Sequence, residues 1–379
     1  MTHHHDDVSP ADTKVRVINL LAILVPFAAF IIAVTFFWGY ALTLPIFIIM
    51  MVMGIATAFG ITVGFHRLVT HKSFETIAPV RFLFAVLGSM AVQGPVIEWA
   101  ATHRKHHQHS DDEHDPHSPH SGAHGSWGQG IRATLRGAFH AHFGWLLMGH
   151  RRGLGRYSKD LREDPVLVAV SRQFPLWVLA GLVIPAVLGG LFTQSWIGVL
   201  QGFLWGGLVR IFVVHHITWS VNSVCHIWGT HPFRSHDHSR NNAIVGILAM
   251  GEGWHNNHHA FPTSARHGLR WWEFDASYML IRTLSFFGLA HRIRTVSAEQ
   301  MRAKRSDMSD IPAPVEFIEP PARLREIGVP VTAPTEAAVA EPIAASTTEA
   351  AVAEPIAAST IEARPVELDP IRSADQLPG

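Results

Sequence analysis

The sequence INLLAILVPFAAFIIAVTFFWGYALTLPIFIIMMVMGIATAFGITVGF, residues 18–65, contains no Asp, Glu, Lys or Arg. Such a run is long enough for two membrane crossings, because one helical crossing needs roughly 20 apolar residues. The expected spans are residues 18–38 and 41–65, joined by a tip at Gly39 and Tyr40. The stretch therefore predicts an integral membrane protein that begins with a helical hairpin.

A second uncharged run, residues 173–209, begins another pair of spans, expected at about 174–192 and 196–216. The apolar stretch at 82–97 is shorter and contains Gly94, so we expect an interfacial or protein-packed helix there. Of the 379 residues, 48% are hydrophobic and only 16% are charged, which argues against several soluble domains. We predict an all-α membrane protein with four transmembrane helices in two hairpins.

The placement of lysine and arginine predicts the orientation of the spans. The hairpin tips at 39–40 and 193–195 contain neither residue, whereas the N-terminal arm has Lys14 and Arg16. Many more basic residues follow the second and fourth spans. By the positive-inside rule, both termini and the large central region are expected on the cytoplasmic side of the cytoplasmic membrane. No cleavable signal is expected, since the first apolar run is long and lacks a cleavage site.

The chain divides into three parts by composition. Residues 1–15 are a polar arm, 16–300 the membrane domain, and 301–379 a tail in which TEAAVAEPIAAST at 335–347 recurs at 348–360. The tail is rich in Ala, Pro and Glu, so it is expected to be disordered. A single cysteine, Cys225, excludes an internal disulfide and most thiolate metal chemistry. No segment resembles a nucleic-acid-binding module.

Two histidine triplets among the 27 histidines share the spacing i, i+3, i+4: HRKHH at 103–107 and HNNHH at 255–259. These positions share one face of a helix, so we expect the three imidazoles of each triplet to converge on one point. An ordinary surface or core histidine is the common case. An identical triplet that occurs twice instead indicates metal ligands.

Two further pieces lie close to span ends. HRLVTH contains His66 and His71, which a regular helix would place about 140° apart. They are therefore expected to straddle a helix break or to serve two different ions. NSVCH places Asn222 and His226 at i, i+4, with Asn222 a candidate ligand through water or a partner of a ligand. Nine neutral imidazoles could hold two first-row metal ions with four or five ligands each.

The flanks of these motifs resemble the membrane-bound fatty acid desaturases, in particular the acyl-CoA delta-9 (stearoyl-CoA) type. The stretches that carry the resemblance are GFHRLVTHKSF (64–74), EWAATHRKHHQHSDDEHDPHSP (98–119), TWSVNSVCHIWGTHPF (218–233) and GEGWHNNHHAFP (251–262). It extends over about residues 18–294. It implies four transmembrane helices capped by a cytosolic helical domain that holds a histidine-ligated dimetal site. The implied iron ligands are His66, His71, His103, His106, His107, His226, His255, His258 and His259, with Asn222 acting through water.

The resemblance also implies the reaction. Two iron ions would use O2 and two external electrons to place a cis double bond at carbon 9–10 of a saturated long-chain acyl-CoA such as stearoyl-CoA. A methylene has no acidic proton, so a metal–oxygen oxidant is needed. The chain has no fused flavin or cytochrome domain, so an NAD(P)H-linked flavin/iron–sulfur reductase, a ferredoxin or a cytochrome is expected to supply the electrons. A bacterial, actinobacterial source is expected.

Substrate contacts are implied by position. Trp219 and Thr218 would line the bend of an acyl tunnel, and Gln93 and Trp99 fall in the family's substrate-contacting stretch. The sequence departs from the family at Gly94, and also at residue 101, where an alanine replaces arginine.

Met50 and Gly54, one turn apart deep in the second span, are candidates to close the end of the tunnel. Arg151 and Arg152 could pair with CoA phosphates, or could be ordinary basic residues at an anionic membrane surface.

Other charged residues have expected supporting roles. Asp111 and Asp115 are candidate acceptors that orient ligand imidazoles. Arg210, near the end of the fourth span, is expected to support the metal site, to be paired, or to snorkel to the interface. The histidines that follow the first triplet are expected in a solvated loop: His109, His114, His117, His120 and His124.

Three alternatives remain open. An acyl-lipid desaturase or a fatty acyl hydroxylase would use the same nine histidines, and product analysis would separate them. A metal transporter would need acids or histidines at mid-membrane, and the four expected spans have essentially none. A structural zinc site remains open because imidazoles also bind zinc.

Overall fold

The computed structural model describes residues 13–39, 41–122, 125–148 and 153–306. Residues 1–12 of the polar arm, the repeat in the tail, and Arg151 and Arg152 lie outside the described residues. The described part is helical, with two short antiparallel ribbons. The ribbons pair β1 (Glu75–Thr76) with β4 (Ala290–His291), and β2 (Ser121–Gly122) with β3 (Gly125–Ser126).

Four helices are long and apolar enough to cross a membrane: Thr13–Phe37, Leu44–Thr70, Phe174–Thr193 and Trp196–His226. They confirm the four expected spans. The first is α1 (Thr13–Phe37) and the third is α7 (Phe174–Thr193). The second joins α2 (Leu44–Phe59) to the π-helix η1 (Gly60–Thr70). The fourth joins α8 (Trp196–Gln201), the π-helix η5 (Gly202–Val209), α9 (Arg210–Ser223) and η6 (Val224–His226).

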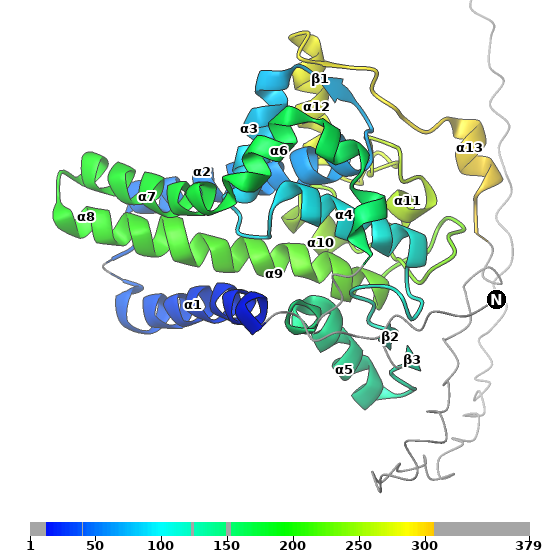
Figure 1. The fold of residues 1–379 in the computed structure, drawn as a ribbon, viewed down its shortest axis with the longest axis horizontal. Helices are drawn as coiled ribbons and strands as arrows, with labels where there is room; N and C mark the ends of the chain where they lie inside the picture. The colour runs from blue at the N-terminus through cyan, green and yellow to red at the C-terminus, as the bar shows by residue number, and fades with distance from the viewer. Residues whose placement is uncertain (1–12, 40, 123–124, 149–152, 307–379) are drawn as a thin grey trace, which may run out of the picture. The chain divides into compact units, whose positions relative to one another are not determined.

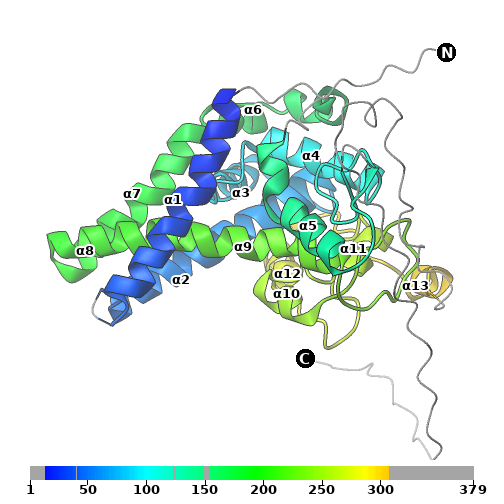
Figure 2. The same ribbon diagram turned by 90° about the horizontal axis from the view of Figure 1, so that it is seen from below.

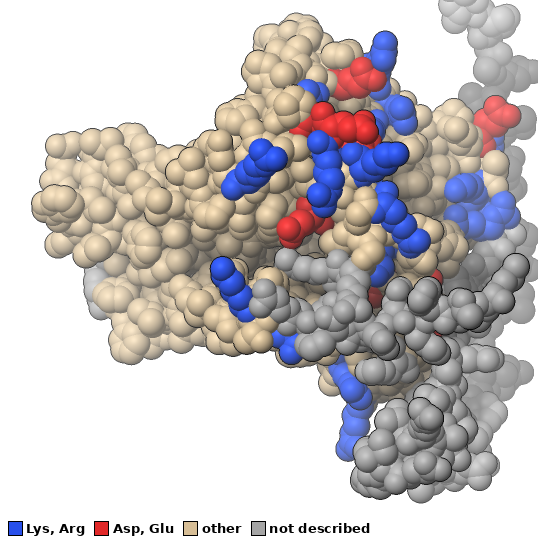
Figure 3. Space-filling model, viewed as in Figure 1, with Lys and Arg blue, Asp and Glu red and all other residues tan. Residues whose placement is uncertain are grey.

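The second and fourth helices extend beyond the expected ends at 65 and 216, to Thr70 and His226. Figure 1 shows these long helices running from the span region into the part that carries α4 (Val96–His109) and α11 (His255–Ala260). On the face drawn in Figure 3, charged side chains gather over this second part, and the surface formed by α7 and α8 carries none. This distribution fits a membrane band with a polar region at one end.

The expected helix at 82–97 is wrong as a single element. α3 (Ala78–Ser89) covers only the first half of the expected stretch, and α4 begins at Val96. The backbone between them reverses at Val92 and Gly94, whose φ angles are +61° and +99°. Gly94 tolerates this conformation because it has no Cβ. The break allows α3 to pack on the membrane helices, while α4 carries its histidines elsewhere.

α3 lies directly on η1. A Cβ on Gly60 would stand 2.1 Å from the backbone nitrogen of Gly88, so neither glycine can be replaced without separating the two helices. Phe65, Phe84 and Ile281 are buried in the core beside this contact. The π-helical end of the second span is therefore held rigidly, and all eleven of its residues are buried.

The remaining helices surround the histidine-rich part. They are α5 (Ile131–His142), α6 (Pro165–Arg172), α10 (Ala243–Leu248), α12 (Ala276–Phe286) and α13 (Ala298–Ala303). Three 3₁₀ turns complete it: η2 (Gly144–Leu147), η3 (Leu154–Tyr157) and η4 (Asp160–Glu163).

The side chain of Arg210 is buried and held by backbone carbonyls. Its side chain is 1% exposed and donates to the carbonyl oxygens of Gly206, Met90 and Gly181 at 3.1, 2.8 and 2.7 Å. It does not snorkel, and none of these hydrogen bonds reaches a histidine of the triplets. The guanidinium instead joins the fourth span to α7 and to the end of α3, because three carbonyl dipoles can stabilise a buried cation.

Candidate metal centre

All nine predicted histidines come together, in two groups. The five-histidine group contains His66, His71, His103, His107 and His258, and the four-histidine group contains His106, His226, His255 and His259. Within each group the candidate ligand atoms all lie within 4.8 Å of one another. Two adjacent groups with five and four nitrogen donors suit two first-row metal ions.

His66 and His71 belong to one group because η1 is a π-helix. The backbone N–H of His71 donates to the carbonyl of His66 at 3.1 Å, which is the i→i+5 bond of that helix type. The extra residue in the turn brings the two rings to 4.8 Å between centroids. Of the two expectations for this pair, separate ions do not fit, because both rings lie in the five-histidine group. A helix break does fit, because η1 ends at Thr70 and His71 lies just beyond it.

Each triplet divides between the two groups, so the expected convergence on one point is also wrong. His103 and His107 of α4 enter the five-histidine group, and His106 enters the four-histidine group. In α11, His258 enters the five-histidine group, and its neighbours at 255 and 259 enter the other. Residues at i and i+4 lie about 40° apart on a helix, whereas i+3 and i+4 lie about 100° apart. The third imidazole must therefore point to a second site.

The spacing of the ring nitrogens suits bound metal. The Nε2 atom of His258 lies 3.0 Å from that of His66 and 2.9 Å from that of His107. In the other group, the Nε2 atoms of His255 and His226 are 3.0 Å apart. Two nitrogens that bind one ion at about 2.1 Å and at right angles are separated by about 3.0 Å. The buried Nε2 atoms of His106 and His259 have no hydrogen-bond partner among the described residues, as expected for atoms that face an ion.

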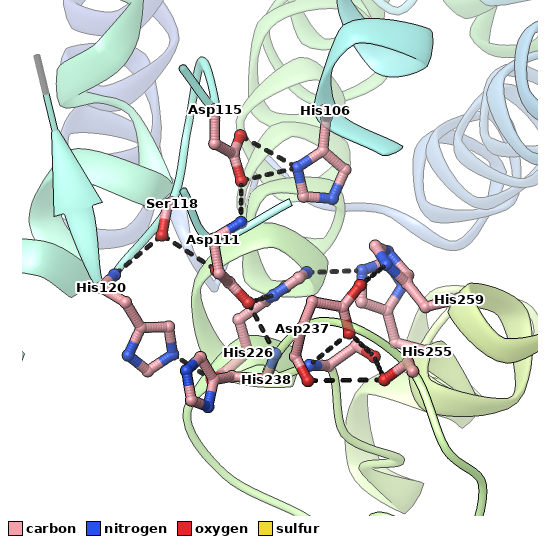
Figure 4. Close-up of polar contacts among 12 residues, drawn as sticks. His106, Asp111, Asp115, Ser118, His120, His226, Asp237, His238, His255 and His259 are labelled. Carbon is pink, nitrogen blue, oxygen red and sulfur yellow. Dashed lines mark hydrogen bonds and ion pairs between the residues drawn. The ribbon is translucent and has the colours of Figure 1, made fainter. Parts of the chain in front are cut away.

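Carboxylates hold the other ring nitrogen of several ligands. Three of them serve the four-histidine group (Figure 4): Asp115 accepts from His106 at 3.0 Å, Asp111 from His226 at 2.8 Å, and Asp237 from His259 at 2.5 Å. Such bonds fix the ring orientation and make the imidazole a stronger donor. The expected orienting role of Asp111 and Asp115 thus has the required geometry.

One carboxylate serves the five-histidine group in the same way. Glu252 accepts from Nδ1 of His66 at 2.6 Å and pairs with the fully buried Arg67 at 3.2 Å. Arg67 is in turn held by Asp275 at 2.8 Å. This series of ion pairs connects η1 to the start of α12.

Sequence reasoning missed Glu252 and Asp237. Glu252 stands three residues before His255 in the stretch GEGWHNNHHAFP. Its closeness to the triplet could have marked it as a partner of a metal ligand. Asp237 lies in the loop SHDHS, and no spacing rule links it to His259.

Burial keeps these histidines in the form that binds metal. It lowers the pKa of His103, His107 and His258 well below the ordinary value, and the facing histidines lower it further. Metal ions bind the neutral imidazole, so these three histidines are in the metal-binding form at neutral pH.

The loop after α4 is more buried than expected. His117 is 4% exposed and lies against His106, with ring centroids 4.3 Å apart. His120 lies 2.7 Å from the carbonyl of His226, to which its ring N–H can donate. His109 and His114 fit the solvated prediction better, and His124 lies outside the described residues. The loop packs here because Asp111 and Asp115 are drawn inward to their histidines.

An apolar cavity of about 470 Å³ ends at the two groups. His66 and His103 of the five-histidine group line it, as does His255 of the four-histidine group. The predicted substrate residues on described positions also line it: Met50, Gly54, Gln93, Trp99, Thr218 and Trp219. A volume of this size is typical of a small-molecule site.

The polar end of the cavity is ordered by hydrogen bonds. Nε2 of Gln93 donates to the hydroxyl of Thr218 at 2.9 Å, and the indole of Trp99 donates to Gln93 at 3.4 Å. Asn222 lines the same cavity, one helical turn before His226. Cys225 is fully buried, and its thiol lies 3.9 Å from the carbonyl of Gly253, so it packs rather than binds metal.

The fold and the site define a class of protein: a membrane protein with four apolar spans and two adjacent histidine groups that can hold metal. A family model for fatty acid desaturases matches residues 41–292. The chain belongs to the fatty acid desaturase family, and is an oxidoreductase of lipid metabolism.

Individual relatives are named for different substrates. The chain is 41% identical over 286 residues to the hex-5-enoyl-[acyl-carrier protein] acetylenase of Moorena producens, covering 76% of this chain and 88% of that protein. It is 38% identical over 244 residues to the sn-1 stearoyl-lipid 9-desaturase of Anabaena variabilis, covering 64% and 80%. It is 32% identical over 239 residues to a probable acyl-CoA desaturase of Schizosaccharomyces pombe, covering 62% and 46%.

Proposed function

We propose that this protein is an O2-dependent di-iron desaturase that inserts a cis double bond, at carbon 9–10, into a saturated acyl-CoA such as stearoyl-CoA. One observation carries the proposal: a single apolar cavity is lined by ligands of both histidine groups. An acyl chain in that cavity would present one section of its length to both ions. The family, whose members desaturate fatty acyl chains, supports the same reaction class.

The nine histidines would hold two iron ions, with Asn222 acting on the four-histidine group through water. Bound iron would supply the oxygen chemistry that an unactivated C–H bond requires. The protein's own residues hold and orient the ions and keep water out. His106, His226, His255 and His259 are each at most 5% exposed. The separation of about 3.0 Å between ring nitrogens also fits right-angled coordination better than the tetrahedral arrangement of structural zinc.

Substrate position would be set at both ends of the cavity. Trp219 and the Gln93–Thr218 pair would shape the chain beside the ions. Met50 and Gly54 would receive its methyl end. Gly54 and His66 are twelve residues apart along the second span, which is at most roughly 18 Å because part of this stretch is π-helical. A chain end that reaches Gly54 would therefore leave an interior methylene near the metals.

The carrier and the partners belong to the same proposal. Relatives are named for acyl-CoA, acyl-lipid and acyl-carrier-protein substrates, so similarity supports several carriers. An acyl-lipid desaturase is the second candidate, favoured by the coverage of the stearoyl-lipid 9-desaturase. The site would face the cytoplasm, and a separate NAD(P)H-linked reductase, ferredoxin or cytochrome would deliver electrons.

The decisive experiment supplies membranes containing the protein with NADPH, O2, an electron donor and labelled stearoyl-CoA. The expected product is a cis-9 chain, with the double bond located by mass spectrometry. A parallel reaction with stearoyl-phosphatidylglycerol tests the second candidate. A hydroxylated product, or turnover by protein that contains zinc and no iron, would contradict the proposal.

A larger side chain at Gly54, at the deep end of the cavity, should shorten the preferred chain. A Cβ at Gly54 would stand 3.6 Å from Cγ of Arg210, so Gly54→Ala fits and Gly54→Leu fills the space beyond. We expect Gly54→Ala to reduce use of the longest chain and Gly54→Leu to shift preference by several carbons, measured as product ratios from a mixture of C14 to C18 substrates. Val52→Leu is the matched control, since Val52 is 59% exposed and does not line the cavity. Unchanged ratios in Gly54→Leu would refute the assignment.

A further inference from the structure

Five residues that line the cavity are also exposed at the protein surface. They are Met51 (43%) and Ile55 (41%) in α2, Val213 (39%) in α9, and Ile247 (60%) and Leu248 (55%) in α10. Other lining residues, such as Ile61 and Trp219, are 2% and 6% exposed, so contact with the cavity alone does not produce these values. A side chain that lines a cavity and is half exposed stands at an opening. The cavity therefore opens between α2, α9 and α10.

This opening faces the bilayer. Met51 and Ile55 lie near the middle of the span Leu44–Thr70, and Val213 lies within the span Trp196–His226. Their neighbours Ile48 and Val52, at 51% and 59%, are exposed as lipid-facing residues of a span are. All five residues at the opening are apolar, so their side chains would contact the acyl chains of the bilayer.

The opening is elongated along the membrane normal. Met51 and Ile55 are one helical turn apart in mid-span, whereas α10 follows the fourth span in the chain and lies beside α9 (Figures 1 and 2). Val245 of α10 packs on Val221 of α9, which fixes α10 at the end of the slit. Ile247 and Leu248 thereby extend the apolar rim toward the membrane surface.

We infer that this slit is a lateral port through which the acyl chain of a bilayer lipid enters the cavity sideways, while its head group stays at the membrane surface. A chain that moves from bilayer to cavity remains in apolar surroundings, whereas entry from water would expose it. The fate of the acyl chain inside the cavity rests on the proposed function. Its entry through the port does not. The inference names membrane-resident acyl lipids as the class of ligand admitted, and so deepens the second candidate function, the acyl-lipid desaturase, and not the acyl-CoA one.

The test uses the full chain in phosphatidylcholine vesicles in which one acyl chain carries a diazirine. After irradiation, mass spectrometry locates the cross-linked residues, and neither metal nor turnover is required. The wild type should be labelled at interior residues such as Met50 and Ile61. Ile55→Trp and Val213→Trp should lose this interior labelling because the indole fills the slit. Val52→Trp, at an exposed position on α2 outside the cavity, should retain it.

Ile55→Ala keeps the test decisive if a tryptophan variant fails to fold, because a wider slit should retain or increase interior labelling. Labelling confined to Ile48 and Val52 in the wild type would overturn the port, as would equal interior labelling in all variants. Failure of the proposed function would look different. A protein that takes up the diazirine lipid but forms no double bond refutes the desaturase and leaves the port standing. Desaturation of acyl-CoA by a protein without interior labelling refutes the port and leaves the desaturase standing.

Discussion

The five-histidine and four-histidine groups use the same kind of ligand but differ in what holds the ligands. Among the described residues, one carboxylate, Glu252, supports an imidazole of the five-histidine group, and a buried arginine shares it. Three carboxylates support three of the four imidazoles in the other group. Imidazoles paired with carboxylates are stronger donors. The protein can therefore make two ions unequal with ligand atoms that are all neutral nitrogen.

The largest effects should follow removal of a ligand from either group. We expect His258→Ala and His255→Ala each to reduce desaturation to background, because both ions are needed for the reaction. Each variant should lose about half of its iron, measured per mole of purified protein, since the other group stays intact. His291→Gln, at a side chain 52% exposed, is the control and should keep activity and iron. A His255→Ala protein with full iron would break the division into two groups.

Removing a carboxylate should have a smaller effect that is confined to one group. We expect Asp237→Asn and Glu252→Gln each to reduce metal affinity or activity by roughly 10- to 100-fold, the usual range for partners of metal ligands. Iron titration of the metal-free protein should show one weakened site in each case, the four-histidine site for Asp237→Asn and the five-histidine site for Glu252→Gln. Asp112→Asn, which pairs with the exposed-loop His109, should change neither. Equal weakening of both sites by Asp237→Asn would show that the carboxylates do not act separately.

The smallest effect concerns acid sensitivity of the metal-free protein. Burial lowers the pKa of His258 well below its ordinary value of about 6.5. The unfolded chain then binds more protons than the folded one. The contribution of such a histidine to the free energy of unfolding is therefore fully present above about pH 6.5. As the pH falls below that value, the contribution decreases by about 1.4 kcal/mol per pH unit.

For His259, burial lowers the pKa but the Asp237 carboxylate opposes this. His258→Gln should therefore flatten the pH dependence of unfolding between pH 6.5 and 5.5 more than His259→Gln does. Thermal unfolding in detergent at several pH values would measure the difference. Equal slopes in the two variants would show that the carboxylate does not distinguish these histidines.

The spans and the ligand set could be predicted from the sequence because both depend on local spacing. Uncharged runs located four helices. The repeated triplet selected six histidines, and two motifs near span ends added the other three of the nine that the fold brings together. The winding of η1 could not be predicted, since a π-helix has the composition of an ordinary span. For the same reason, the sequence did not predict that His66 and His71 lie in one group.

The partners of the ligands lie beyond local patterns. Asp237 reaches His259 from a loop 22 residues earlier, and Arg210 binds the carbonyls of Met90 and Gly181, which are distant in the sequence. Such contacts depend on tertiary packing, to which spacing along the chain gives no access. The division of each triplet was predictable from helix geometry, because the angle between i+3 and i+4 is too large for one ion.

That division has a consequence for how the protein is made. α4 contributes to both groups, and so does α11, which is synthesised about 150 residues later. The five-histidine group is complete only once His258 has been synthesised, and the four-histidine group only once His259 has been. A nascent or truncated chain that ends earlier lacks candidate ligands in both groups, so neither complete set exists until all four membrane helices have been synthesised. An ion that needs a complete histidine group could therefore not be the template on which the first two spans assemble.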